Sequence, residues 1–158
     1  MTKDALVVAL DQTLSLADSR AVFGLRLGGA PQAETLPLNQ GVVAVVQAEA
    51  AAGRAVFLLA EDAALASKLA SRLGIFAGII VPDHGIGETR LQAVLRVTKG
   101  RPFGFIGHDA ADMPIWHAAH QAWVVGGGRH LRQKVNGVPL AGGSSTLYLG
   151  ARTWASHA

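Results

Sequence analysis

Cysteine is absent from the 158-residue chain, and acidic residues are absent from its carboxyl-terminal part. Without cysteine the chain can form neither a disulfide nor a thiolate metal site, which is consistent with a reducing compartment. No Asp or Glu occurs from Met113 to Ala158, whereas Arg129, Arg132, Lys134 and Arg152 all fall in this segment. These basic residues are typical of a solvated face, and they could also meet an anionic partner or membrane surface.

Long hydrophobic runs and aromatic residues are also scarce. No apolar stretch approaches the ~18–20 residues that a bilayer-spanning helix needs, so we expect no transmembrane segment. The segment Met1–Asp4 leads into a short apolar run without a small-residue cleavage pattern. We therefore expect no signal peptide and a cytoplasmic protein, peripheral to a membrane only through a partner. Aromatic residues make up 6% of the chain. They do not interleave with the basic residues, which argues against nucleic-acid binding.

The remaining composition indicates a folded domain. Half of the residues are hydrophobic and 16% are charged, which is typical of a globular protein with one core. We expect one α/β domain over residues 1–140 and a loose tail over 141–158. Within the tail, Tyr148–Trp154 either adds an edge strand or stays irregular.

Strand and helix patterns alternate along the chain with short connections. Apolar runs predict strands at 6–10, 55–60, 78–81, 102–107 and 122–125, and helices are expected at 40–52, 63–73, 88–99 and from Asp109 or Asp112 to 119. Asn39 and Asp62 are good N-caps for the first two helices. In the helix at 88–99 we expect Leu91, Val94 and Leu95 to point inward. This alternation predicts a doubly wound parallel sheet.

The first predicted strand ends in polar residues. Leu6–Leu10 is followed by Asp11, Gln12 and Thr13. In a parallel sheet, ligands bind beyond the carboxyl ends of the strands, so Asp11 is expected at a binding edge. The stretch resembles the opening motif Asp-x-Asp-x-Thr of the haloacid dehalogenase-like (HAD) phosphatase superfamily.

Further segments carry the same resemblance, which extends over roughly Leu6 to Pro139. It is nearest to the soluble phosphatase-like domain attached to membrane prenyltransferases that resemble the ubiquinone-type enzymes. The segments are Leu38-Asn39, Ala51-Ala52-Gly53-Arg54, Leu73-Gly74-Ile75-Phe76 and Ala111-Asp112-Met113-Pro114-Ile115-Trp116, the last of them after Phe105-Ile106-Gly107. The resemblance implies a three-layer Rossmann-like fold with a minimal cap, inserted at about residues 15–37.

The resemblance also implies a catalytic pattern, from which this sequence departs. The family's nucleophilic aspartate falls on Ala9, whereas Asp11 and Thr13 match the motif. A family threonine falls on Leu59, with Glu61 shortly after it, and the family's lysine falls near Thr89. His108 takes the place of the principal magnesium carboxylate, Asp109 follows it, and Asp112 matches the second acid.

These departures predict a catalytically degenerate domain. A methyl group at position 9 cannot attack phosphorus. Phosphoryl transfer also depends on a metal cation that neutralises the phosphate, and a site that has lost acidic ligands binds such a cation weakly. We expect a pseudo-phosphatase that acts as a binding or regulatory module, with no cofactor, through a protein partner or self-association. By resemblance, the partner would be a membrane prenyltransferase or another enzyme of a lipid or glycan pathway. The alternative is a weak or altered phosphomonoester hydrolase with Mg²⁺ held by Asp11, Asp109 and Asp112.

Several structural roles stay open beside the expected cleft of Ala9, Asp11, Thr13, Glu61, His108, Asp109 and Asp112. Asp11 either fixes a turn or contacts a ligand, and Thr13 is suited to pin the same turn. Asp112 is more readily an N-cap than a site residue. Arg90, next to the missing lysine, either compensates for it or, as the favoured interpretation, lies on the helix surface.

Two further features carry weaker hypotheses. His117 and His120 are three residues apart on an expected helix and could share a transition metal with His108; a surface role is the ordinary interpretation. The glycines at 126–128, followed by Arg129 and Arg132, could cradle an anion with free backbone amides.

Overall fold

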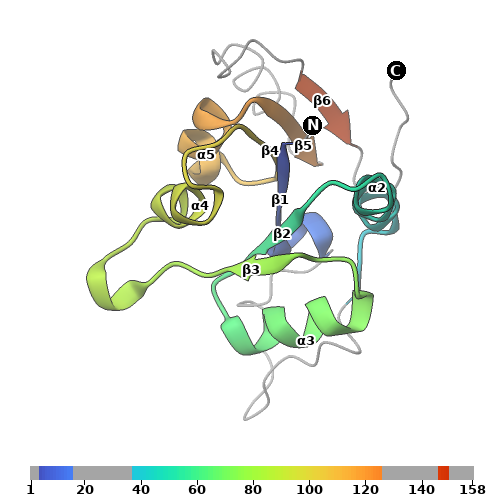
Figure 1. The fold of residues 1–158 in the computed structure, drawn as a ribbon, viewed down its shortest axis with the longest axis horizontal. Coiled ribbons are helices and arrows are strands. Elements are labelled where there is room, and N and C mark those ends of the chain that lie inside the picture. Colours follow the sequence, from blue (N-terminus) through green and yellow to red (C-terminus); the bar gives the residue numbers. More distant parts are fainter. Residues whose placement is uncertain (1–3, 16–36, 126–145, 150–158) are drawn as a thin grey trace.

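The computed structural model describes residues 4–15, 37–125 and 146–149 of the chain. Six parallel strands form one sheet in the order β3-β2-β1-β4-β5-β6 (Figure 1). The strands are β1 (Ala5–Ala9), β2 (Val56–Leu59), β3 (Gly78–Ile80), β4 (Phe103–Gly107), β5 (Gln121–Val125) and β6 (Thr146–Leu149). The helices are η1 (Leu10–Leu14), α2 (Gln40–Ala51), α3 (Ala63–Leu73), η2 (His84–Ile86), α4 (Arg90–Thr98), η3 (Ala110–Asp112) and α5 (Met113–Ala118).

Helices cover both faces of this sheet, which gives the three-layer α/β fold expected from the sequence. Strand β1 lies in the middle, and its side chains alternate between two cores. Leu6 and Val8 pack with the buried valines of α2 and the leucines of α3. Val7 and Ala9 face the other layer, where α4 and α5 contribute residues such as Val94 and Trp116. Figure 1 shows α2 and α3 apart from α4 and α5, with the sheet between them.

The strand order reverses beside β1. Strand β1 pairs with β2 on one side and with β4 on the other, so the connections run outward in opposite directions. In parallel α/β sheets this arrangement opens a crevice at the carboxyl ends of the two neighbouring strands. The residues that directly follow β1, β2 and β4 therefore meet at one edge.

Strand β1 continues directly into a single wide helical turn. The amide of Ser15 donates to the carbonyl of Leu10 at 2.9 Å, which closes the π-helical turn η1. The hydroxyl of Thr13 donates to the carbonyl of Asp11 at 3.3 Å, and Thr13 is fully buried. Thr13 thus pins this turn, as the sequence predicted. Ser15 and Leu38 then form an isolated antiparallel bridge.

Local capping explains most helix boundaries. The Asn39 and Asp62 side chains accept amide hydrogen bonds at the starts of α2 and α3, as expected. Helix α4 begins two residues later than predicted because Thr89 and Gln92 form a capping box. Within α4, Val94 is buried as expected, but the prediction for Leu95 is wrong, since it is 38% exposed. Ala93, the residue directly before Val94 and two before Leu95, is fully buried instead.

Two sequence hypotheses about the segment after β4 are also wrong. Asp112 stands at the N-cap position of α5, yet its side chain makes no capping hydrogen bond. Its carboxylate binds Arg90 instead. Helix α5 ends at Ala118, so His117 and His120 do not share a helix face. The His120 amide instead donates to the carbonyl of Phe103 at 2.7 Å.

Some predictions fall on other parts of the chain. The cap-like insertion at 15–37, the glycines at 126–128 and the basic residues that follow them lie largely or wholly outside the described residues. Of the tail at 141–158, the structure describes Thr146–Leu149, which forms β6 beside β5. Across the part of the chain that is described, no helix has the length and apolar character to cross a membrane.

Candidate functional site

A cleft of about 140 Å³ opens at the carboxyl edge of the sheet, where the strand order reverses. We call it the edge cleft; its lining residues are Asp11, Glu61, Arg90, His108, Asp109, Ala111 and Asp112. They follow β1, β2 and β4, apart from Arg90, which is the first residue of α4. Five of the seven residues that the sequence analysis placed in the expected cleft line this cleft, and its use as a functional site stays a prediction. Ala9 and Thr13, also predicted there, are buried and do not line the cleft.

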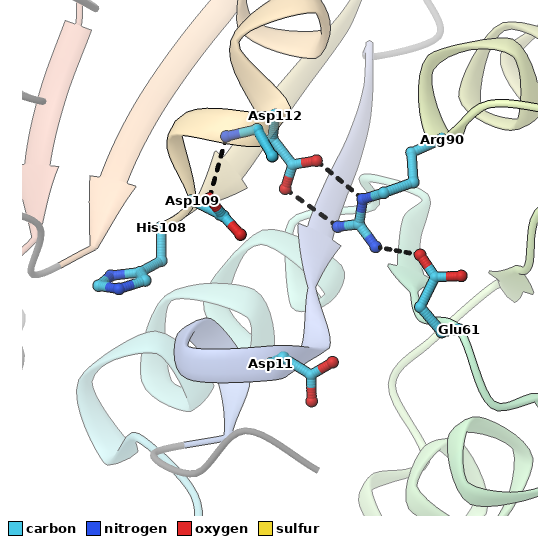
Figure 2. A pocket seen from close by; sticks show the side chains of 7 residues that line it. Asp11, Glu61, Arg90, His108, Asp109 and Asp112 are labelled. Carbon is cyan, nitrogen blue, oxygen red and sulfur yellow. Dashed lines mark hydrogen bonds and ion pairs between the residues drawn. The ribbon is translucent and has the colours of Figure 1, made fainter. Parts of the chain in front are cut away.

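Arg90 is the central group of the edge cleft. Its Nε and Nη2 atoms donate to Oδ1 and Oδ2 of Asp112 at 2.8 and 3.0 Å, a two-point contact. Its Nη1 atom donates to Oε1 of Glu61 at 3.0 Å. Figure 2 shows the guanidinium between the two carboxylates, one from the end of β2 and the other from η3 after β4. Arg90 therefore ties together two strand ends on opposite sides of β1.

This contact corrects the favoured interpretation of Arg90 as a helix-surface residue. The side chain of Arg90 is 29% exposed and that of Asp112 only 5%. A carboxylate so deeply buried needs a partner, because an unpaired buried charge costs several kcal/mol. The sequence did contain one signal: the Thr89–Gln92 capping box fixes Arg90 at the first turn of α4.

The charges around Arg90 keep it protonated. Burial on its own lowers the pKa of Arg90, but hydrogen bonds and attraction from Asp112 and then from Glu61 outweigh it, so that the pKa is raised above its ordinary value. The guanidinium is thus a permanent cation within the cleft. Glu61 also accepts a hydrogen bond from Nε2 of His84 at 3.0 Å, a contact that was not predicted from the sequence.

The other predicted site residues have different roles. Nδ1 of His108 donates to the carbonyl of Val125 at 2.8 Å, which ties the imidazole to the end of β5. Asp109 is exposed, and its carboxylate caps η3 by accepting from the Ala111 amide at 3.0 Å. Asp11 lies on the turn that follows β1, apart from the cluster around Arg90 in Figure 2. The lining thus holds four carboxylates against one guanidinium, an excess of negative charge that disfavours a phosphate dianion.

The donor set does not fit the magnesium site implied by the resemblance. A hard cation needs several oxygen ligands. Both Asp112 oxygens are bound by Arg90, position 9 has no carboxylate, and His108 offers nitrogen where an oxygen is needed. Among the described residues no group of three or more His, Asp or Glu side chains is placed to hold a metal ion.

No family model matches the sequence, but it is similar to a curated protein. The chain is 32% identical over 108 residues to the uncharacterized protein y4nM of Sinorhizobium fredii (strain NBRC 101917 / NGR234). The match covers 66% of this chain and 20% of that protein. The chain thus spans about a fifth of the relative's length.

Solved structures share the fold more completely. A protein of unknown function from Bordetella pertussis Tohama I has a TM-score of 0.66 and 17% identity, covering 93% of this chain and 99% of that one. A phospho-aspartyl intermediate analogue of phosphoserine phosphatase has a TM-score of 0.59 and 10% identity, covering 93% and 94%. The cobalt-bound deoxy-D-mannose-octulosonate 8-phosphate phosphatase of Haemophilus influenzae has a TM-score of 0.59 and 14% identity, covering 87% and 75%.

These identities are too low to transfer an activity, but the coverage and TM-scores define the architecture. The overall arrangement of this chain corresponds to that of solved phosphatase structures over most of its length. The chain has the fold of the HAD-family phosphatases.

Proposed function

We propose that this chain is a catalytically degenerate phosphatase-like domain that acts as a binding or regulatory module. One combined observation carries the proposal. Alanine stands at position 9, where the nucleophile is expected, and both oxygens of the Asp112 carboxylate are bound by Arg90. Covalent phosphoryl transfer needs an attacking oxygen and a cation that neutralises the phosphate. The described cleft supplies neither in the required form.

The charge of the cleft supports the same proposal. Glu61 stands at the end of β2 and Asp11 after β1, so two carboxylates face the space that a phosphoryl group would enter. Arg90 is the single guanidinium of the lining, and its donors are already directed at Asp112 and Glu61. A phosphate would have to displace these contacts while meeting like charge.

The relative y4nM supports a role as a module. The matched segment makes up a fifth of that protein, so a stretch of this kind occurs there beside a much larger remainder. We propose that this domain works together with another protein, for which a membrane prenyltransferase or another enzyme of a lipid or glycan pathway is the candidate. Copurification of the tagged chain from native membranes, with such an enzyme identified by mass spectrometry, tests this partner. Recovery of the protein as a partner-free soluble species contradicts it.

The second candidate function is an altered hydrolase, which the carboxylates of Asp11 and Asp109 in the cleft lining favour. A turnover assay distinguishes this hydrolase from a binding module. Generic phosphomonoesters are incubated with the purified protein and Mg²⁺, Mn²⁺ or Zn²⁺. We expect no turnover above that of a heat-denatured sample, because loss of the nucleophile alone commonly costs several orders of magnitude in rate. Metal-dependent turnover that Asp11→Asn abolishes, and that the exposed-site control Asp83→Asn retains, contradicts the proposal.

A further inference from the structure

We infer that Arg90 is the built-in cation of the edge cleft and replaces a divalent metal ion there. The inference rests on the proposed function in one respect, since both describe the same cleft, but it concerns ion binding and not turnover. It is tested by a readout that needs no enzymatic activity.

The first step is the match between the cation and its ligands. Arg90 holds both oxygens of Asp112 and one oxygen of Glu61, at 2.8, 3.0 and 3.0 Å. A planar guanidinium suits two-point binding of a carboxylate, and it cannot lose its proton at physiological pH. These two acids come from either side of β1. The guanidinium thus joins the ends of separate strands, as a bound metal ion commonly does.

The second step is that the backbone of α4 fixes the position of Arg90. Thr89 and Gln92 form a reciprocal capping box around it. Farther along α4, Arg96 donates to both carboxylate oxygens of Glu88 at 2.9 Å, which ties the preceding loop to the helix. The entry into α4 is therefore held on both sides of Arg90. The guanidinium is tethered at a fixed position and therefore has a high effective concentration beside the two carboxylates. A free cation has to compete with it for the same oxygens.

The third step is competition for Asp112. A divalent cation at the cleft would need this buried carboxylate, yet its two oxygens already accept charge-assisted hydrogen bonds. Asp11 and Asp109 remain at the cleft, so removing the guanidinium would leave an acidic, oxygen-rich lining. We therefore expect that the wild-type chain does not bind divalent cations at the edge cleft and that a chain without Arg90 does.

The experiment measures Mn²⁺ binding to the full chain by electron paramagnetic resonance, with thermal melting in parallel. The variants are Arg90→Ala and the control Arg101→Ala, which removes an exposed arginine that does not line the edge cleft. We expect no saturable Mn²⁺ binding up to millimolar concentrations in wild type and in the control. We expect saturable binding in Arg90→Ala, with a melting temperature raised by about 5–10 °C at saturation. Adding Asp112→Asn to Arg90→Ala should abolish the binding.

Two results overturn the inference. One is saturable Mn²⁺ binding by the wild-type chain that Asp112→Asn removes, a measurement that decides the question even if Arg90→Ala does not fold. The other is a folded Arg90→Ala variant that binds no Mn²⁺. Wild-type Mn²⁺ binding without turnover would defeat this inference and leave the proposed function standing. Metal-independent turnover would defeat the proposed function and leave this inference standing.

Discussion

Arg90 shows how strongly one side chain can determine the chemistry of the carboxyl edge of the sheet. The arginine neutralises the buried Asp112 and shares its charge with Glu61. One of the predicted roles nearby agrees with the structure, since Thr13 pins the turn after β1. The role of Asp112 as a helix cap does not hold, since ion pairing with Arg90 takes its place.

The contact of Arg90 could not be read from the sequence because it depends on tertiary distance. A first-turn residue of a helix can point to solvent, as the sequence analysis favoured for Arg90, or to the sheet edge, and local spacing alone does not determine which. The buried partner decides between them. Asp112 is 4% exposed, and this burial depends on the packing of α5 against β4 and α4.

Replacing Asp112 with asparagine should destabilise the fold. Asp112→Asn leaves Arg90 without its ionised partner in a partly buried place, at a cost of about 3 kcal/mol in the free energy of unfolding. Urea unfolding followed by circular dichroism measures the change. The control Asp109→Asn alters an exposed cap, where asparagine serves as well as aspartate, and should stay within about 0.5 kcal/mol of wild type. Equal effects of the two substitutions would contradict the assigned role of Asp112.

At the scale of secondary-structure elements, the sequence pattern was most informative where the chain is regular. The strands and helices at 5–9, 40–51, 56–59, 63–73, 103–107 and 121–125 lie within a few residues of their predicted places. The boundaries of these elements are determined by nearby residues, namely apolar runs, N-caps and positive-φ glycines such as Gly74. The pattern was less informative for α4, whose inward face depends on where the Thr89–Gln92 capping box starts the helix.

The loop before α4 provides an element-scale prediction with a pH dependence. Hydrogen bonds from Arg96 and then from the Asp83 backbone amide hold the pKa of Glu88 below its ordinary value. A depressed pKa means that the folded state prefers the ionised carboxylate. The stabilisation is therefore present above about pH 4.3, the usual range of glutamate, and is lost as the pH falls through the lower pKa of the folded state.

Glu88→Gln tests this contact. The melting temperature of wild type should exceed that of the variant near neutral pH, and the difference should shrink as the pH is lowered from about 6 to about 3. Thermal melts in matched low-salt buffers give the comparison. A difference that is independent of pH over this range would show that the Glu88 charge does not stabilise the entry into α4.

At the scale of the whole molecule, the fold of the chain does not determine the chemistry of its cleft. The doubly wound sheet follows from alternating apolar runs, and the structures that share it include phosphatases with bound metal and with a phospho-aspartyl analogue. The same sheet in this chain places a methyl group at Ala9, a guanidinium at the cleft and surplus carboxylates around it. A fold supplies an edge at which residues can meet, and the residues present determine what that edge can do.

The measurement that tests the central claim most directly is capture of a phosphorylated enzyme. The wild-type chain is incubated with a reactive acyl phosphate and Mg²⁺, quenched in acid, and weighed intact by mass spectrometry, beside a phosphatase of the same fold that carries the aspartate nucleophile. We predict a phosphoryl mass increase for the active phosphatase and an unchanged mass for this chain, because Ala9 offers no oxygen to phosphorus. An acid-stable, base-labile phosphoryl group on this chain, mapped to Asp11 or another cleft carboxylate, would contradict the account.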